Sequence, residues 1–560
     1  MARVYMETFG CQMNELDSEL VAGRLAQLGH TLTARPDEAD VMLYNTCSVR
    51  EQAEQKVLSR LGELRRVKRR RPTLVVGVLG CMAERDGAAL MQRMPVVDLM
   101  CGPGELDKLP QLLDNAVRTR ASLAADGLAE ASANLAALQG NTSRRSATLS
   151  AAQDGLEMLD LSRAFAPTDP HAGQRQAYVR ITRGCNKFCT YCVVPFTRGA
   201  EVHRPPEHII DECKRLADAG VVEVTLLGQT VNHYRFEHGA AVTVGGVTQP
   251  QKGRTYKGSH RRDAFAGTNV TTFADLLAQI HERVPAIRRL RFVTSYPRDF
   301  GDDVLEVMRS CERICRYLHV PAQSGSDAVL QRMNRGYSVG QYLEFLDRAR
   351  HFLDQPEIGR PLMLSGDIIV GFPGETDEDY QATVRLVERA RYKNCFIFKY
   401  SPRPGTVAYQ RIPDDVPESV KRQRNNDLLA IQARIGQAIG QEQIGRRFDV
   451  LVEGYSQKQL KAAGLSGAAR KPRTVELTVG GSTLAGATQP PDVPAGPGPV
   501  QLTGRSDGDL IIHFEVPDAA RAKALIGQIV PVEVTDAGPL SLQGRLVTPG
   551  VRPMPVPSGA

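Results

Sequence analysis

The sequence predicts an α/β protein built from an amino-terminal parallel sheet, a central (β/α)6 partial barrel and a small carboxy-terminal antiparallel β-barrel. Three observations support this fold class. Strand-like and helix-like stretches alternate up to about residue 118, six further strand–helix units follow, and short strands with Gly and Asp turns come last. The alternation indicates a parallel sheet covered by helices, whereas the last pattern indicates a small antiparallel barrel.

The elements of the amino-terminal sheet come first. The runs VYMETFG, VMLYNT and TLVVGVLG are apolar and rich in β-branched residues, which is typical of buried strands. Between them, ELDSELVAGRLAQLG and REQAEQKVLSRLGELRRVKRRR carry apolar residues at helical spacing. The central unit has six strand candidates, which are YVRITRG, VVEVTLLGQ, RRLRFVTSYP, RYLHVPAQSG, MLSGDIIVGFPGE and CFIFKYSP. Ligands of such a barrel bind at the carboxyl ends of its strands.

The last unit contains the runs RFDVLVEGYS, DLIIHFEV, IVPVEVTDA and LQGRLV, which alternate with turn residues. A stretch rich in Ala, Ser and Gly before the central barrel predicts a low-complexity linker with some helix, and two Gly-rich stretches predict surface insertions. The predicted units are an α/β domain at 1–118, a linker at 119–172, the central barrel at 173–442 with an insertion at about 236–271, the small β-barrel at 443–550 with an insertion at about 457–498, and a flexible tail at 551–560.

Composition narrows the class of protein. Of the 560 residues, 42% are hydrophobic and 24% are charged, which is ordinary for a folded protein and excludes global disorder. The net charge of +7 is compatible with nucleic-acid binding but too small to argue for it. No apolar run reaches membrane-spanning length, and the start, MARVYMETFGCQMNELDSE, lacks the apolar segment of a secretory signal. We therefore expect a cytoplasmic protein without membrane contact.

The strongest motif is GCNKFCTYC, which follows the first strand of the predicted barrel. Cys185, Cys189 and Cys192 have the spacing C-x3-C-x2-C. A closed structural zinc site needs four ligands, and the nearest further thiol, Cys213, lies 21 residues on in a predicted helix. Three thiolates suit a [4Fe–4S] cluster with one iron left without a protein ligand. That iron can chelate the amine and carboxylate of S-adenosylmethionine (SAM).

A second set of cysteines follows the carboxyl ends of three predicted strands of the amino-terminal sheet. Cys11, Cys47 and Cys81 are separated by 36 and 34 residues, about one strand–helix repeat each. Parallel strands connected in this way place all three thiols at one edge of the sheet, where they can converge on one ligand. The alternative is three independent strand-end cysteines. Cys101 follows the next apolar run, and we predict that it is not a ligand.

The cysteine triplet resembles that of the radical SAM superfamily. This resemblance implies that Tyr191 packs on the adenine of SAM, although a core tyrosine is the alternative. It also implies cofactor-binding positions at Gln229, after the second strand, and at Ile369 and Gly371 in DIIVGFPGE. Taken alone, Gly and Pro after strands are common turn residues.

The motifs TFGCQMNELDSE, NTCSVREQAEQK, GCMAER and GCNKFCTYCVVPFTRG resemble the methylthiotransferase family, and within it the MiaB-type branch, the tRNA-2-methylthio-N(6)-dimethylallyladenosine synthases. LLGQTVNHYR, PAQSGSDAVL and SPRPGT support the same branch. The resemblance implies two [4Fe–4S] clusters, one that binds SAM and one auxiliary, with SAM as both methyl donor and radical source. The implied reaction adds a methylthio group to carbon 2 of dimethylallyladenosine at tRNA position 37. No catalytic side chain beyond the cluster ligands is implied.

Other functions stay open at this point. The substrate could be a threonylcarbamoyladenosine in tRNA or an aspartate of a ribosomal protein. A chain that binds RNA without catalysis and uses its thiols for structural zinc would contain stoichiometric zinc and be colourless. A pure electron-transfer protein is disfavoured, because it would not need six β/α units or an open iron.

The last unit resembles a TRAM domain, an RNA-binding module, through LTGRSDGDLIIHF. The resemblance implies a nucleic-acid contact at Arg505, but Asp509 and Leu510 replace the usual Asn and basic residue, which weakens that expectation. The basic run at 65–71 is either a solvated helix face or a polyanion-facing patch. The implied partners are the anticodon stem-loop of a tRNA carrying dimethylallyladenosine and an electron donor such as flavodoxin or ferredoxin, with the chain acting as a monomer.

Overall fold

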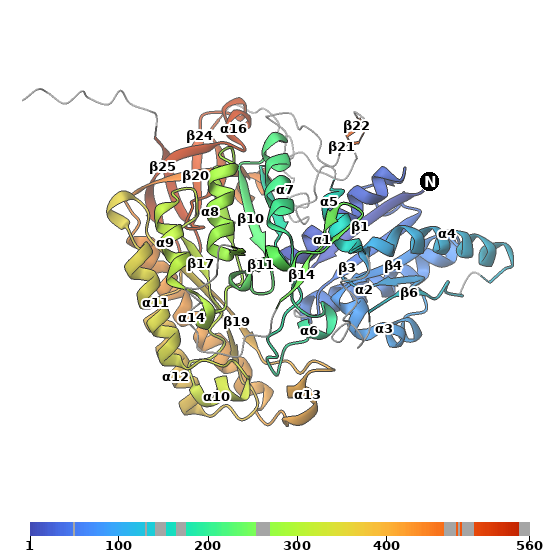
Figure 1. Ribbon diagram of the computed structural model, residues 1–560, viewed down its shortest axis with the longest axis horizontal. Helices are drawn as coiled ribbons and strands as arrows, with labels where there is room; N and C mark the ends of the chain where they lie inside the picture. Colours follow the sequence, from blue (N-terminus) through green and yellow to red (C-terminus); the bar gives the residue numbers. More distant parts are fainter. Residues whose placement is uncertain are drawn as a thin grey trace, which may run out of the picture.

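Three units lie against one another in this computed structural model (Figure 1). The amino-terminal sheet flanks the central barrel, and strands β20, β24 and β25 of the carboxy-terminal barrel lie at one end of it. The residues that the structure describes are 1–48, 51–128, 131–139, 153–163, 175–253, 269–463, 478–479, 482–483 and 498–547.

The amino-terminal sheet is parallel, as predicted, with strand order β2-β1-β3-β4-β5-β6. Its central strands are buried on both faces, which explains their uninterrupted apolar sequence, and separate hydrophobic clusters cover the two faces. The elements are β1 (Arg3–Phe9), α1 (Gln12–Gln27), β2 (Thr31–Leu32), β3 (Val41–Thr46), α2 (Glu51–Arg70), β4 (Val75–Gly80), α3 (Cys81–Arg93), β5 (Leu99–Cys101), α4 (Leu109–Ala125), β6 (Leu135–Ala137) and α5 (Gly155–Leu161).

The expected linker at 119–172 is in part folded structure. It includes the end of α4, the edge strand β6, which pairs with β5, and the short helix α5, whose Leu156 and Leu159 are buried in the amino-terminal core. The composition predicted some helix here, but it gave no sign of the strand β6 or of the burial of α5, because their partners lie far away in the sequence. Residues 129–130, 140–152 and 164–174 of the stretch lie outside the described residues.

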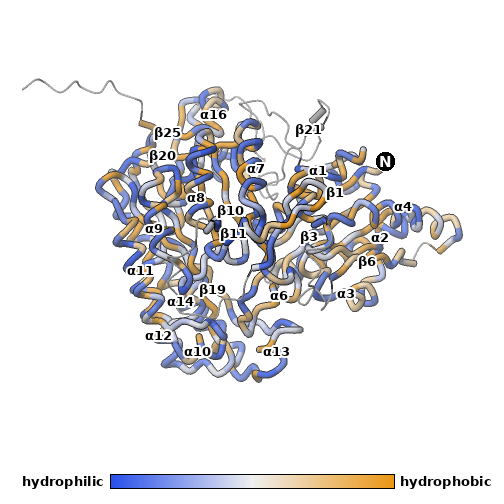
Figure 2. Tube along the Cα trace, viewed as in Figure 1, coloured by the Kyte–Doolittle hydropathy of each residue, from blue (hydrophilic) through white to orange (hydrophobic). Residues whose placement is uncertain are grey.

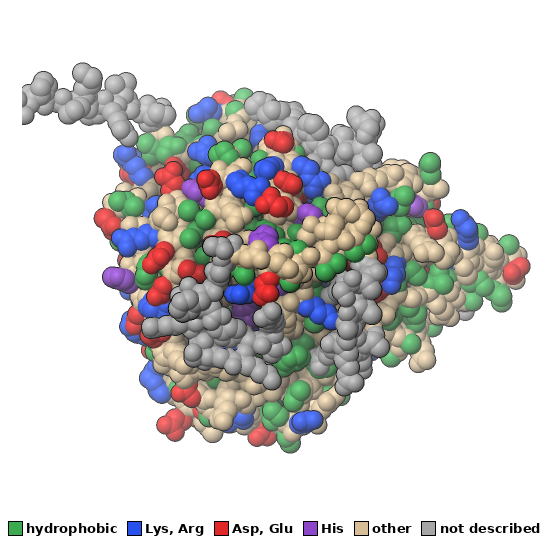
Figure 3. Space-filling view, in the orientation of Figure 1, with side chains coloured by type: hydrophobic (Ala, Val, Ile, Leu, Met, Phe, Trp, Pro, Cys, Tyr) green, Lys and Arg blue, Asp and Glu red, His purple; other side chains and the backbone are tan. Residues whose placement is uncertain are grey.

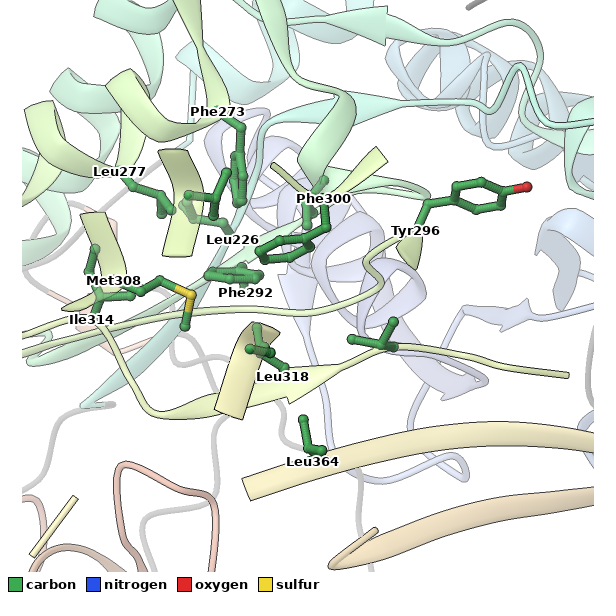
Figure 4. Packing of buried hydrophobic residues seen from close by; sticks show 14 of the residues in the cluster. Leu226, Phe273, Leu277, Phe292, Tyr296, Phe300, Met308, Ile314, Leu318 and Leu364 are labelled. Atoms are coloured by element: carbon green, nitrogen blue, oxygen red, sulfur yellow. The ribbon is translucent and has the colours of Figure 1, made fainter. Parts of the chain in front are cut away.

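The central unit is the predicted partial barrel of six parallel strands. Two three-stranded sheets, β16-β10-β7 and β17-β18-β19, are joined by a parallel bridge between Leu290 and Ile314. Helices cover its outside, and the core between strands and helices contains the edge-to-face pair Phe273 and Phe292, with ring centroids 5.1 Å apart (Figure 4). The elements are β7 (Gln176–Arg180), β8 (Thr182–Arg183), α6 (Val194–Thr197), β9 (Val202–His203), α7 (Pro206–Asp218), β10 (Glu223–Leu227), α8 (Phe273–Arg283), β16 (Arg289–Phe292), α9 (Asp302–Ser310), β17 (Tyr317–His319), α10 (Asp327–Arg332), α11 (Val339–Leu353), β18 (Met363–Val370), α12 (Asp377–Ala390), β19 (Asn394–Lys399), α13 (Val407–Arg411) and α14 (Glu418–Gln441).

The predicted insertion at 236–271 forms small antiparallel pairs where the structure describes it. β11 pairs with β15, β12 with β13, and β14 adds to β9 of the core. Residues 254–268 lie outside the described residues. The short strands are β11 (Arg235–Glu237), β12 (Thr243–Val244), β13 (Val247–Thr248), β14 (Gln251–Lys252) and β15 (Val270–Thr272).

The carboxy-terminal unit is a closed five-stranded barrel with the order β20-β23-β24-β26-β25. One feature differs from the expectation of a purely antiparallel barrel, since β24 and β26 pair in parallel and so close it. The insertion at 457–498 begins with a short helix, most of its remainder lies outside the described residues, and so does the tail at 551–560. The elements are β20 (Arg447–Tyr455), α15 (Gln457–Ala462), β23 (Val500–Arg505), β24 (Ile511–Val516), α16 (Ala519–Leu525), β25 (Ile529–Ala537) and β26 (Leu542–Leu546).

The helices on the outside are amphipathic, and the visible face of the molecule is mixed in charge. The outer helices α9, α11 and α12 alternate hydrophilic and hydrophobic positions along the chain (Figure 2), and acidic and basic side chains are interspersed on the face in Figure 3. Among the described residues, none of the helices has the length and apolar character that crossing a membrane requires.

A buried ion-pair network joins the amino-terminal unit to the barrel. Arg180 on β7 contacts Asp17 on α1 at 3.0 Å and Asp160 on α5 at 2.7 Å. Arg204 contacts Glu157 on α5 at 2.9 Å. All five side chains are at most 1% exposed, so α5 is held between the two units by charges shielded from water. Arg163, Glu19 and Glu212 extend this network.

Candidate active site

The amino-terminal thiols meet at one edge of the sheet, as expected from the topology. Cys11 follows β1 and caps α1, Cys47 follows β3, and Cys81 begins α3 directly after β4, and these three strands are neighbours. A hydrogen bond from the Cys47 thiol lowers the pKa of Cys11 to about 6, and the Cys11 thiol lies 3.2 Å from Asn14 Oδ1. Burial raises the pKa of Cys81, and the Cys11 charge adds to that effect. The three thiols therefore act on one another electrostatically.

The surroundings of this set suit thiolate ligands. The hydroxyls of Thr46 and Ser48, on either side of Cys47, are buried and have no hydrogen-bond partner within the part of the chain that the structure describes. The Thr197 hydroxyl and the Arg198 charge both lower the pKa of Cys81, opposing its burial. Hydrogen-bond donors and a cation around thiolates are the usual outer partners of metal ligands. The donor set thus fits an iron–sulfur cluster.

The second set of thiols lies in the loop that follows β7 and β8. Cys185 accepts a hydrogen bond from the Lys187 backbone N–H at 3.3 Å, and the Cys192 N–H donates to the Cys189 carbonyl at 3.0 Å. Burial raises the pKa of Cys185 to about 12 and also raises that of Cys192, and the neighbouring cysteines increase both shifts. A bound cationic cluster would stabilise three neighbouring thiolates, because its positive charge offsets the hydration that the thiolates lose on burial. Among the described residues, no three His, Cys, Asp or Glu side chains meet closely enough to hold a single metal ion.

Three of the four predicted SAM-binding residues lie in or next to one small hydrophobic cluster. Tyr191 and Ile369 pack against the same small hydrophobic cluster, in which the Tyr191 and Phe372 ring centroids are 6.4 Å apart. Gly371 follows β18 with φ +68°, and a Cβ there would come within 2.3 Å of a Lys421 carbon, so only glycine fits.

Gln229 lines a central cavity, and the hydroxyl of the next residue, Thr230, lies 3.9 Å from Cys185 Sγ. The assignment of all four to SAM remains a prediction.

One residue that the sequence reasoning missed is Arg335. Its Nη1 donates to Cys189 Sγ at 3.4 Å and to Tyr191 Oη at 3.3 Å. Its guanidinium also lies 5.0 Å from the Tyr296 ring centroid. A buried arginine that contacts both a cysteine of the triplet and the predicted adenine-binding tyrosine fixes their relative positions. It lies about 145 residues beyond the triplet, and no local motif pointed to it.

A second missed residue, Arg198, links the two thiol sets. The triplet loop runs directly into α6, which packs on α3, the helix that begins with Cys81. Arg198, at the end of α6, contacts Asp17 of α1 at 2.8 Å, and both side chains are buried. The barrel therefore places a positive charge beside the amino-terminal thiols. The sequence signal for Arg198 is its place in the motif GCNKFCTYCVVPFTRG, but the motif by itself predicts no role for this residue.

A central cavity of about 850 Å³ connects the three units. Cys11 and Cys47 line it from the amino-terminal unit, lumen-facing residues such as Gln229 line it from the barrel strands, and Arg505 lines it from the carboxy-terminal barrel. It runs through the barrel lumen, from the first residues of β7, β10 and β19 to the loop after β10, and its place between domains is typical of substrate sites.

Arg505, the predicted nucleic-acid contact, is engaged within the chain. Its guanidinium lies 3.2 Å from Glu453 and 2.8 Å from Asp509, and its side chain is 33% exposed. Asp509 also pairs with Lys393 of the central barrel at 2.5 Å. The Asp that replaces the usual Asn of the motif thus joins the two barrels, and a role for Arg505 in RNA contact stays a prediction.

The other sequence candidates lie elsewhere. In the basic run at 65–71, Lys68 is buried against Asp98 at 2.7 Å and Arg71 donates to the Asp37 carbonyl at 3.0 Å, so part of the run supports the fold. Cys101 is buried in β5, where its thiol lies 3.2 Å from the Glu105 carbonyl oxygen. Cys213 is buried in the main barrel core.

A six-stranded partial barrel with three cysteines after its first strand defines a radical SAM enzyme, here preceded by a second thiol-bearing domain. Comparison with family descriptions agrees, since the Radical SAM superfamily matches residues 179–387 and the Uncharacterized protein family UPF0004 matches residues 3–102. The prediction that SAM and [4Fe–4S] are cofactors is confirmed by this match.

Similar proteins of known name identify the family within the radical SAM superfamily. The chain is 40% identical over 551 residues to a tRNA-2-methylthio-N(6)-dimethylallyladenosine synthase of Rhodopirellula baltica, covering 97% of this chain and 95% of the relative. A synthase of the same name from Burkholderia multivorans is 36% identical over 549 residues, covering 97% of each chain. The chain therefore belongs to the tRNA-2-methylthio-N(6)-dimethylallyladenosine synthase family. Among solved structures, the radical SAM methyltransferase TsrM of Kitasatospora setae matches with a TM-score of 0.44 and 14% identity, covering 73% of this chain and 77% of that one.

Proposed function

We propose that this chain adds a methylthio group to carbon 2 of N(6)-dimethylallyladenosine at tRNA position 37, with SAM as methyl donor and radical source. The observation that carries the proposal is the joining of the two thiol sets through Arg198, next to a cavity large enough for a nucleoside. Family membership supports the same reaction.

Each group of residues would have its own binding role. Cys185, Cys189 and Cys192 would hold the SAM-binding cluster, and Tyr191, Gln229, Ile369 and Gly371 would hold SAM itself. The amino-terminal set, which is Cys11, Cys47 and Cys81, would hold the auxiliary cluster. When bound, the first cluster supplies the electron that cleaves SAM, and the second supplies the sulfur. The chain contributes binding, orientation and exclusion of water, because no side-chain acid or base can replace an aromatic C–H bond by C–S.

The proposed partner is the anticodon stem-loop, which would present a flipped nucleoside to the cavity. Arg505 is our candidate for RNA contact at the rim, and phosphate contacts would make binding weaker at higher salt. An electron donor such as flavodoxin or ferredoxin would reduce the first cluster. We propose that the chain acts as a monomer in the cytoplasm.

The test is anaerobic reconstitution followed by turnover of three synthetic stem-loops, which carry dimethylallyladenosine, threonylcarbamoyladenosine or unmodified adenosine at position 37. We expect methylthiolation of the first alone, identified by mass spectrometry of the nucleosides. We also expect about eight irons per chain, falling to about four when Cys185, Cys189 and Cys192 are changed to Ala. Product on the threonylcarbamoyl loop would reassign the substrate, and a fall from about four irons to none would remove the auxiliary cluster and methylthiolation with it.

A further inference from the structure

The last strand of the central barrel presents two phenyl rings to open space. On β19, Cys395 and Ile397 point into the main core, as the alternation of a strand requires. Phe396 and Phe398 point to the other face, into the lumen, where they are 46% and 40% exposed. Their rings lie stacked, with centroids 6.5 Å apart and an interplanar angle of 15°. Two neighbouring exposed phenyl rings are unfavourable in water and indicate a binding surface.

These rings face the place where the proposed chemistry occurs. Both line the cavity of about 850 Å³ that Cys11 and Cys47 line from the amino-terminal unit. In the sheet register, Phe398 pairs with Ile369, the residue predicted to bind SAM. A ligand resting on the rings would therefore lie beside the predicted SAM site, in the cavity that the amino-terminal thiols line.

Polar groups border the rings on the neighbouring strands. Phe396 pairs with Asp367 of β18, so their side chains lie next to each other on the lumen face. His319 of β17 lies 3.3 Å from the Asp367 carboxylate through Nε2, and both side chains line the cavity. The site thus combines an apolar wall with a hydrogen-bonding pair, which suits a base that has both a hydrocarbon substituent and ring nitrogens.

Charge favours a neutral, apolar substituent over an acidic one. Among the described residues, six acidic side chains line the cavity against three basic ones. The three basic ones are already paired with carboxylates. A threonylcarbamoyl group or an aspartate would bring a further carboxylate against two phenyl rings and beside Asp367, where its desolvation is not offset. A dimethylallyl group carries no charge and gains from contact with the rings.

We propose that Phe396 and Phe398, with Asp367 and His319 beside them, form the subsite for the modified base, and that the two rings select dimethylallyladenine over unmodified adenine. This subsite rests on the proposed function. It adds that recognition of the substituent resides in β19.

The test measures binding of two anticodon stem-loops, with and without the dimethylallyl group, to the anaerobically reconstituted enzyme. Fluorescence anisotropy gives both affinities for the wild type and for the Phe396→Ala and Phe398→Ala variants. We expect each variant to lose about tenfold in preference for the dimethylallyl loop, while affinity for the unmodified loop changes by less than about twofold. The Phe398→Leu variant, which keeps apolar contact, should retain part of the preference.

Tyr409→Ala is the matched control, because Tyr409 on α13 is an exposed aromatic residue, at 54%, that does not line the cavity. Its preference should equal that of the wild type. Iron content equal to the wild type verifies that each variant is folded and loaded.

If the wild type methylthiolates the dimethylallyl loop and both alanine variants keep its preference, the subsite is wrong and the proposed function stands. If the wild type methylthiolates no dimethylallyl loop, the proposed function fails, and the subsite with it.

Discussion

The Asp509→Asn substitution tests how the carboxy-terminal barrel is fixed to the central one. Asn is nearly isosteric and tolerates the left-handed backbone at this position, where φ is +63°. The change therefore removes the charge and one of the two oxygens that accept hydrogen bonds from Lys393 and Arg505. Burial raises the pKa of Asp509, but Lys393, Arg291 and Arg505 outweigh it and hold that pKa below its ordinary value. The carboxylate is therefore charged in the folded protein at neutral pH, and its contribution to stability is lost only in strong acid.

The magnitude follows from the partners that remain. Arg291 keeps Glu223 at 3.4 Å and Arg505 keeps Glu453 at 3.2 Å, but Lys393, only 10% exposed, loses its carboxylate. One buried cation without a counter-ion costs about 3 kcal/mol, the lower end of the range for breaking a buried pair. Combining Asp509→Asn with Lys393→Met removes that cation, and the cost should fall to about 1 kcal/mol.

Hydrogen exchange of β23 and β24, followed by mass spectrometry, measures local opening of the carboxy-terminal barrel. We expect opening to become roughly 100-fold more frequent in Asp509→Asn and to return most of the way in the double variant. Glu515→Gln, an exposed carboxylate on β24, is the control and should change nothing measurable. A cost below about 1 kcal/mol for the single variant, or equal costs for the single and double variants, would refute this account of the junction.

Two further predictions concern buried charges near the thiol sets. Arg198→Gln removes the cation beside the amino-terminal thiols, so the reduced auxiliary cluster should be less stable. We expect a lower midpoint potential in an EPR-monitored titration and roughly tenfold weaker iron retention. An unchanged midpoint potential would contradict this role of Arg198. At His233, burial lowers the pKa, but Glu201 and Asp299 outweigh it and the net pKa is raised. The stabilisation from His233 is therefore complete below its unfolded pKa of about 6.5 and is lost as pH rises through the folded value. In urea unfolding, His233→Gln should therefore lose more stability at about pH 5.5 than at about pH 9. The reverse order would rule out this role of His233.

Much of the fold could be predicted because its signals are local. All six barrel strands, and strands β1, β3 and β4 of the first sheet, appear where the sequence places them, because each is a short run of strand-forming residues between helical stretches. The same topology placed Cys11, Cys47 and Cys81 at one edge, because parallel strands end together.

What could not be predicted depends on partners distant in the sequence. β6 is three residues long and exists because β5 offers it an edge. The parallel closure of β24 on β26 likewise follows from barrel geometry rather than from either strand. In the run CFIFKYSP every early residue is apolar, so the pattern cannot tell that Phe396 and Phe398 face an open lumen and not a core.

The buried network around Arg180 and α5 decides which molecule has to move when substrate arrives. Swinging the amino-terminal unit away from the barrel would leave Asp17, Asp160 and Arg180 without partners, at about 3–5 kcal/mol for each broken pair. Unstacking one base from an RNA loop costs only a few kcal/mol. For the proposed substrate, the adaptation therefore falls to the RNA, which inserts a single nucleotide into a preformed chamber, and recognition begins with how readily that nucleotide leaves its stack.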